Sequence, residues 1–425
     1  MTASARVAVL VAAAGAGWEA QALDLVERGG PGLVLSRRCV DLTDLLATAT
    51  TRLADAAVVS PTLPGLDADS VAALQRCGVA VVAVGTAEDL RDGEADRLLR
   101  LGVGRVLPAD RLEELAPALL AAGAETTPDH PEEIPETPAE ERGRARLVAV
   151  WGPTGAPGRT TVAVGLASEA AAAGHEAFLL DVDPYGGAVA QHLGVLDEVS
   201  GLLAAARAAN TGRLDGERLG TLARQASERL RVLTGLPRAD RWPEVRPQAF
   251  DDLLDEARAL TGQGLVVLDT GFSLESDAGD AFGGGAPQRN GMTLEALRAA
   301  DEVVVVGAAD PVGLARLARA LVELREVVPG VAPRVVVNRT RASLGWADKE
   351  VRGMVEGFVT PRDVHFLPDD RAAADRALMA GTSLAESGDS PLRTAMAELA
   401  RAVVGDPPQP AARRGLRRRR AGRAR

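Results

Sequence analysis

The chain has 425 residues, of which 46% are hydrophobic and only 3% aromatic, so we expect cores packed from Leu, Val and Ala. The net charge is −11, yet eight of the 48 basic residues are arginines within 413–425, which gives an acidic body with a basic tail. Two cysteines, Cys39 and Cys77, argue against a disulfide framework, and no apolar run is long enough to span a membrane. A cytoplasmic protein without a signal peptide is expected.

The composition changes twice along the chain. Residues 123–146 are rich in Pro, Glu and Thr and have almost no large apolar side chains, which predicts a linker. This linker separates residues 1–122 from residues 147–406. In both regions strand patterns alternate with helical ones. Residues 407–425 are predicted to be a disordered, Arg-rich tail. Such alternation predicts an α/β fold with two doubly wound parallel sheets, the first of the flavodoxin type.

Five strands and five helices are expected in the first region. The strands are Val7–Val11, Gly32–Leu35, Ala56–Val59, Val79–Val84 and Val103–Val106. The helices are Glu19–Glu27, Leu42–Leu53, Asp69–Arg76, Ala87–Leu101 and Arg111–Ala122.

The ends of these strands carry a recognisable pattern. Ser60 follows the third strand, Pro64 and Gly65 come four residues later, Thr86 follows the fourth strand, and Leu107 with a proline ends the fifth. The pattern resembles a response-regulator receiver domain, in which an aspartate stands at the position of Ser60, a lysine at that of Leu107 and an acidic pair after the first strand. Phosphoryl transfer to aspartate needs those groups. We therefore expect a degenerate receiver used for docking, dimerisation or localisation; another small α/β domain is the alternative.

The second region begins with an apolar strand, Leu147–Val150, followed by the loop WGPTGAPGRTT at 151–161 and an Ala-rich helical pattern, Val162–Ala173. This order is typical of a phosphate loop, in which backbone N–H groups and a helix N-terminus bind phosphate. The loop departs from the pattern G-x-x-x-x-G-K-[ST], because Pro153 stands at the first glycine and Arg159 at the lysine. The sequence therefore indicates a phosphate-loop fold strongly, but it indicates catalysis at that loop only weakly.

Further strands are predicted at Ala177–Leu180, Leu230–Leu233, Gly264–Leu268, Glu302–Val306, Arg334–Val337 and Val364–Leu367. Polar residues follow three of them, as Asp181-Val-Asp183, as Asp269-Thr, and as Asn338-Arg339. Together with the loop and the segment AGTSL near the end, these motifs resemble the deviant-Walker ATPases that include MinD and ParA. A degenerate receiver ahead of such an ATPase resembles the CpaE and TadZ proteins of that family.

The resemblance implies ATP or ADP with Mg²⁺ as the ligand. The residues implied to hold the nucleotide are Gly155, Ala156, Gly158, Arg159, Thr160, Thr161, Asn338 and Arg339, with Asn338 on the adenine edge. Thr160, Asp181 and Asp269 are implied to support Mg²⁺, and Asp183 is implied to orient the attacking water.

Three departures from the family pattern weaken the implied chemistry. Thr154 stands where active members carry a signature lysine, and Pro157 has no N–H to offer a phosphate. Arg159 is a planar fork rather than a compact ammonium. Loss of both lysines is expected to slow hydrolysis on the order of 10³-fold or more, which leaves a nucleotide-binding protein that is a weak ATPase at most.

The resemblance implies a spatial regulator that acts as a homodimer. It would position a Tad-type pilus or secretion apparatus, or the division septum, through contacts with a secretion ATPase or division proteins, recruited to the membrane, the pole or the septum. Two alternatives stay open: an active ATPase that cycles between monomer and dimer, and a ParA-like partitioning protein bound to DNA. The tail at 413–425 is either a contact for anionic membrane or nucleic acid, or a solvated relic of coding bias.

Overall fold

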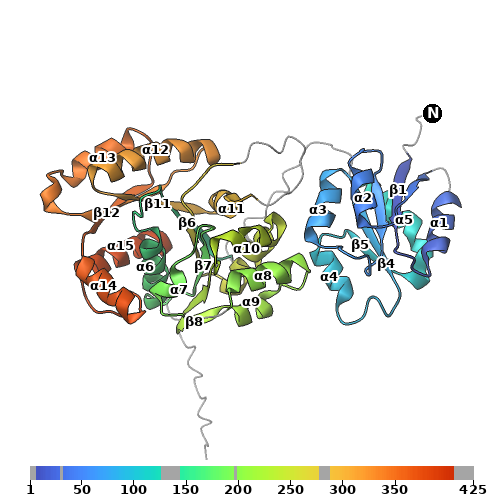
Figure 1. The fold of residues 1–425 in the computed structure, drawn as a ribbon, viewed down its shortest axis with the longest axis horizontal. Coiled ribbons are helices and arrows are strands. Elements are labelled where there is room, and N and C mark those ends of the chain that lie inside the picture. Colours follow the sequence, from blue (N-terminus) through green and yellow to red (C-terminus); the bar gives the residue numbers. More distant parts are fainter. Residues whose placement is uncertain (1–5, 29–31, 126–143, 196–198, 277–287, 406–425) are drawn as a thin grey trace, which may run out of the picture.

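The computed structural model describes residues 6–28, 32–125, 144–195, 199–276 and 288–405. Most of the predicted linker and all of the predicted tail lie outside these residues. The described chain folds around two sheets that form two lobes side by side (Figure 1).

The first sheet is parallel and has the strand order β2-β1-β3-β4-β5. Its strands are β1 (Val7–Ala12), β2 (Leu33–Arg38), β3 (Ala56–Val59), β4 (Ala80–Gly85) and β5 (Arg105–Pro108). The helices are α1 (Glu19–Arg28), α2 (Leu42–Ala49), α3 (Ala68–Arg76), α4 (Glu94–Arg100), the short 3₁₀ helix η1 (Ala109–Glu114) and α5 (Leu115–Glu125). This order is the flavodoxin-type arrangement expected from the sequence.

Helices cover both faces of the first sheet. Leu45 of α2, Val71 of α3 and Leu98 of α4 belong to the core on one face. Val26 of α1 and Leu119 of α5 belong to the core on the other face. All four residues of β3 are buried, as a parallel strand with helices on both sides requires.

The fourth helix is shorter than its sequence pattern predicts. The expected helix Ala87–Leu101 begins only at Glu94, because Asp92 and Gly93 have positive φ angles of 54° and 81°. Left-handed residues interrupt a right-handed helix. The residues before them form a turn in which the Thr86 backbone N–H and hydroxyl both donate to Asp89.

The second sheet has, among the described residues, eight strands in the order β13-β12-β11-β6-β10-β7-β9-β8. Its strands are β6 (Arg146–Trp151), β7 (Ala177–Val182), β8 (Arg224–Ser227), β9 (Leu230–Leu233), β10 (Leu265–Thr270), β11 (Glu302–Ala308), β12 (Arg334–Thr340) and β13 (Asp363–Pro368). Only β8 was not expected. It pairs antiparallel with β9 at the sheet edge, and its polar residues carry no apolar pattern that would reveal a strand.

The helices of this region lie on both faces of the sheet. They are α6 (Arg159–Ala172), α7 (Val189–His192), α8 (Gly201–Asn210), α9 (Gly216–Leu222), α10 (Pro247–Thr261), α11 (Gly291–Ala299), α12 (Pro311–Val327), α13 (Asp348–Glu356), α14 (Arg371–Ala380) and α15 (Pro391–Val404), with the 3₁₀ helices η3 (Ala239–Glu244) and η4 (Ala342–Leu344). Strand β6 sends Val148 and Val150 to the core under α6 and α15, and Leu147, Ala149 and Trp151 to the cores of the opposite face. The second region therefore also has the doubly wound α/β fold that the sequence predicts.

The two lobes meet where α3 and α4 face α8 and α10 (Figure 1). The polar contacts across this junction include an ion pair between Arg246 and Asp69 at 2.6 Å and hydrogen bonds from Arg97 to Thr211 O at 3.1 Å and from Arg100 to Gly212 O at 2.7 Å. The two carbonyls follow the C-terminal end of α8, which is the negative end of the helix dipole.

Candidate functional site

The candidate site is the loop between β6 and α6. Strand β6 is central in the sheet, and the chain winds toward β7 on one side of it and later toward β11 on the other. Ligands of doubly wound folds bind at the carboxyl ends of the strands, where the direction of winding changes. The loop therefore lies at the position where this architecture places a binding site.

The backbone of the loop repeatedly enters the left-handed region. Gly155, Ala156 and Gly158 have φ angles of 105°, 51° and 103°. Left-handed residues between right-handed ones turn successive N–H groups toward one concavity, which suits an anion. Ala156 pays a steric penalty that glycine avoids, and such strain is concentrated at functional sites.

Asn338, at the carboxyl end of β12, holds this loop through a side-chain hydrogen bond. Its side-chain amide donates to Pro157 O at 2.8 Å, and its oxygen accepts the Arg339 N–H at 2.9 Å. A Cβ atom on Gly158 would lie 2.4 Å from the Asn338 amide nitrogen, so only glycine fits there. The structure thus gives Asn338 a loop-holding role, and its contact with an adenine stays a prediction. Arg339 is exposed and has a φ of 61°.

Arg159 points into the loop and not into solvent, since only 14% of its side chain is exposed. Its guanidinium donates to the carbonyls of Gly152 at 3.3 Å, Pro153 at 3.2 Å and Thr270 at 3.3 Å. One nitrogen also lies 3.8 Å from a carboxylate oxygen of Asp183. The residue at the lysine position is therefore held by the loop itself and by the Asp183 carboxylate.

Two buried carboxylates end adjacent strands beside the loop. Asp181 and Asp269 are each 1% exposed and face each other across the β7–β10 register. Asp181 accepts the Val189 and Asp183 N–H groups, and burial raises its pKa to about 7. Neither oxygen of Asp269 accepts a hydrogen bond within the described part of the chain.

Burial, followed by the neighbouring Asp181, raises the pKa of Asp269 well above its ordinary value. The neighbouring Thr160 hydroxyl and the charge of Arg159 lower this pKa in part. Burial also raises the pKa of Asp183, and the Tyr185 N–H and Arg159 oppose that rise. A buried carboxylate without a partner needs either a proton or a cation.

The surroundings of Asp269 suit Mg²⁺, which takes part of its ligands from waters and phosphates, better than a metal ion held by protein side chains alone. No cluster of three or more His, Cys, Asp or Glu side chains suited to a metal occurs in the described residues. Mg²⁺ is usually bound by one or two carboxylates together with waters and phosphates of a substrate. Asp269, Asp181 and the Thr160 hydroxyl at the start of α6 supply oxygen donors of that kind.

The structure thus brings most of the sequence-predicted residues together around one loop. The remaining members, Thr154 and Thr161, lie at its exposed rim and in the first turn of α6. Sequence reasoning missed Arg316 of α12, whose guanidinium lies against Gly155. No motif marks Arg316, because its position depends on how α12 packs over β11.

No family model and no curated protein matches the sequence. Among solved structures, the chain is similar to a ParA family ATPase from Chlorobium tepidum TLS, with 16% identity over 60% of this chain and 98% of that one and a TM-score of 0.48. It is also similar to the septum site-determining protein MinD complexed with Mg-ADP from Pyrococcus horikoshii OT3, with 16% identity over 61% and 96% of the two chains and a TM-score of 0.46. The signal receiver domain of NarL from Mycobacterium tuberculosis matches 28% of this chain and 98% of its own length, with 18% identity and a TM-score of 0.26.

The structural neighbours are therefore P-loop ATPases of the MinD/ParA kind and a receiver domain. Within the described ranges no helix is both long and apolar enough to cross a membrane.

The raised pKa values of the buried carboxylate pair lead to a prediction about how the free energy of unfolding depends on pH. Between about pH 4 and 7 the folded protein holds more protons on Asp181 and Asp269 than the unfolded chain, because their folded-state pKa values are raised. The free energy of unfolding should then fall as the pH rises through this window in the absence of Mg²⁺. Asp251 and Asp252, whose pKa values burial raises to about 7 and about 6, add to this fall. The share of the pair is therefore measured with Asp269→Asn, which should raise the free energy of unfolding at pH 8, since a neutral amide avoids the cost of burying or protonating the carboxylate.

Denaturant unfolding at pH 5 and pH 8 measures this effect, with the exposed Asp375→Asn as the matched control. The control should leave the pH dependence unchanged. Wild-type stability that does not fall between pH 5 and 8, or a destabilised Asp269→Asn at pH 8, would contradict the interpretation of this pair.

Proposed function

We propose that this chain binds ATP or ADP with Mg²⁺ at the loop after β6 and that the bound state positions another assembly in the cell. The observation that carries this proposal is Asp269, a buried carboxylate without a hydrogen-bond partner in the described chain, beside Thr160 at the end of a left-handed loop. A site with anion-binding N–H groups and an uncompensated carboxylate suits a phosphate and a divalent cation together.

Each group of the site has a part in this binding. The loop N–H groups and the N-terminus of α6 hold the phosphates, and Thr160, Asp181 and Asp269 hold Mg²⁺ directly or through water. Bound Mg²⁺ supplies charge neutralisation on the phosphates. Asp183, which is 15% exposed at the mouth of the site, orients a water toward the terminal phosphate.

Slow hydrolysis follows from the state of Arg159. Its guanidinium already donates to three backbone carbonyls and faces Asp183, so less of its charge is free for a developing negative charge. Thr154 is exposed and neutral, so it has no positive charge with which to contact a phosphate bound by a partner subunit. Phosphoryl transfer depends on positioning and on charge neutralisation, and removal of such cations costs on the order of 10³-fold.

The proposed cellular role is that of a CpaE- or TadZ-like positioning protein. It would act as a homodimer on a Tad-type pilus or secretion apparatus or at the division septum. The first region would serve for docking rather than phosphoryl transfer: against transfer, Ser60 is 1% exposed and its hydroxyl pairs with Thr62 at 2.8 Å. Ala12 and Ala13, which occupy the place of an acidic pair, are fully buried.

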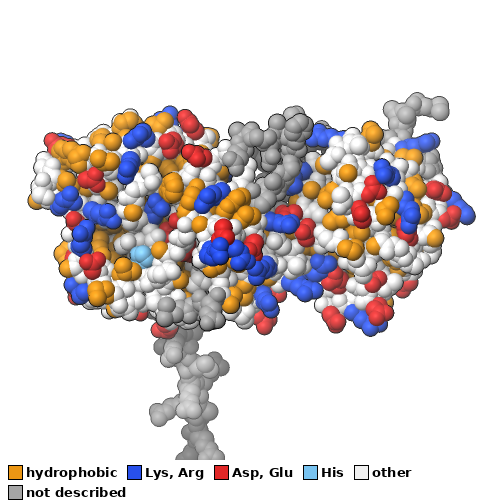
Figure 2. All heavy atoms as spheres, viewed as in Figure 1, with side chains coloured by type: hydrophobic (Ala, Val, Ile, Leu, Met, Phe, Trp, Pro, Cys, Tyr) orange, Lys and Arg blue, Asp and Glu red, His pale blue; other side chains and the backbone are white. Residues whose placement is uncertain are grey.

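A ParA-like DNA-binding role has less support in the described residues. Lys and Arg side chains are interspersed with Asp and Glu on the face shown in Figure 2, and no broad basic surface forms there. Non-specific DNA binding requires clustered positive charge. The tail at 413–425, outside the described residues, does carry a cluster of eight arginines.

Nucleotide binding is tested by calorimetry with ATP and ADP, each with Mg²⁺ and with EDTA. Wild type should bind with a Kd in the micromolar range, and Thr160→Val should weaken the Mg²⁺-dependent part by about tenfold through loss of one oxygen donor. The exposed Thr51→Val serves as the control, since Thr51 bonds only within its own turn. Absence of binding at millimolar nucleotide would overturn the proposal.

The catalytic half of the proposal is tested by turnover with saturating ATP. The phosphate release rate should lie on the order of 10³-fold below that of an intact MinD/ParA-type ATPase assayed in parallel. A rate comparable to the intact enzyme's, lost in Asp183→Ala, would instead identify an active ATPase.

The expected inability of the first region to accept a phosphoryl group is tested with small phosphate donors and mass spectrometry. No phosphate should appear on Ser60, because its hydroxyl is buried and no acidic pair holds a metal there. A competent receiver domain run in parallel serves as the positive control. Stoichiometric phosphorylation of Ser60 would show that the domain is a working receiver.

A further inference from the structure

Arg316 on α12 approaches the loop between β6 and α6 at Gly155. A Cβ atom on Gly155 would lie 2.0 Å from its terminal nitrogen and 3.1 Å from its guanidinium carbon. Any larger residue at 155 would therefore displace the guanidinium. Glycine at this position thus allows both the φ of 105° and the approach of Arg316.

Within the described chain this guanidinium forms no direct ion pair or hydrogen bond. It lines a cleft of about 570 Å³ together with Arg319 and three glutamates, Glu275, Glu323 and Glu326. That cleft also opens onto Pro153 and Thr154 of the loop. A half-buried, unpaired guanidinium against Gly155 adds positive potential at the loop.

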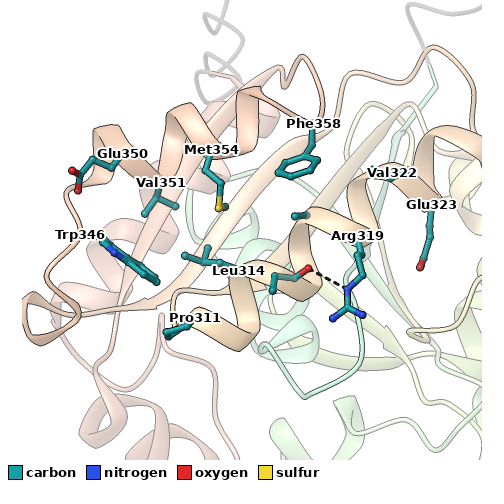
Figure 3. Close-up of a pocket in the computed structure, with 12 residues that line it drawn as sticks. Pro311, Leu314, Arg319, Val322, Glu323, Trp346, Glu350, Val351, Met354 and Phe358 are labelled. Atoms are coloured by element: carbon teal, nitrogen blue, oxygen red, sulfur yellow. Dashed lines mark hydrogen bonds between the residues drawn. The ribbon is translucent and has the colours of Figure 1, made fainter.

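The other arginines of α12 behave differently. Arg319 donates to Ala315 O of its own helix and lies at the edge of the apolar groove between α12 and α13 (Figure 3). Arg325 donates to Phe358 O at 3.1 Å. Arg319 also lines the cleft that Arg316 lines, but of these three arginines Arg316 is the one whose guanidinium lies against Gly155.

We propose that Arg316 binds the terminal phosphate of a nucleoside triphosphate from within the same chain. The inference rests on the proposed nucleotide binding and adds the residue that distinguishes triphosphate from diphosphate. Thr154 carries no charge, and Arg159 is engaged by carbonyls and Asp183. Arg316 therefore supplies the free cation at this end of the loop, and a guanidinium fork pairs well with phosphate oxygens.

The test compares Arg316→Gln with Arg319→Gln by calorimetry, using ATP and ADP with Mg²⁺. Arg316→Gln should weaken ATP binding by about tenfold or more, the usual effect of losing a charge-assisted hydrogen bond, and change ADP binding less than about twofold. Arg319→Gln should leave both affinities unchanged. Arg316→Lys should restore part of the ATP affinity, because it keeps the charge but not the fork.

The outcomes separate this inference from the proposed function. If wild type and Arg316→Gln bind ATP equally while Thr160→Val binds it weakly, nucleotide binding stands and the role of Arg316 is wrong. An equal loss for ATP and ADP would also overturn the assignment to the terminal phosphate. If wild type binds neither nucleotide, both proposals fall.

Discussion

The candidate site depends on one electrostatic constraint, the burial of two neighbouring carboxylates at the ends of β7 and β10. Asp181 has backbone donors, whereas Asp269 has none within the described chain. Two such groups cannot both be ionised in an apolar environment without a positive charge nearby. The surrounding chain is shaped to this pair, because Gly187 and Gly235 pass so close to Asp181 that a Cβ atom on either would collide with its carboxylate.

The opposite end of the sheet shows how the chain treats a buried carboxylate that has only a structural role. Glu302, at the start of β11, has a side chain that is 1% exposed and is surrounded by Arg146, Arg334 and Arg362 at 2.6, 2.5 and 3.3 Å. A buried acid paired in this way needs no ligand. Asp269 differs, because the charge of Arg159 reaches it but no described residue bonds its oxygens, so its site suits an added cation.

The loop is held in place from several directions. Asn338 ties Pro157 to β12, Arg159 ties the loop carbonyls to β10, and Arg316 lies over Gly155 from α12. Two non-glycine residues of the site, Ala156 and Arg339, have positive φ angles. Such a conformation persists only where its surroundings enforce it, and a preformed loop binds a ligand with less loss of entropy.

The sequence by itself determined the alternating elements, the two doubly wound sheets and the place of the loop, because apolar periodicity and glycine spacing are local properties of the chain. It also identified Asp181 and Asp269 through their positions at strand ends. Only the tertiary structure decided that Arg159 turns inward, that Asn338 bonds the loop and that Arg316 lies on Gly155. These contacts join residues more than a hundred positions apart, or set a side chain's direction through packing, and neither leaves a pattern that the sequence reveals.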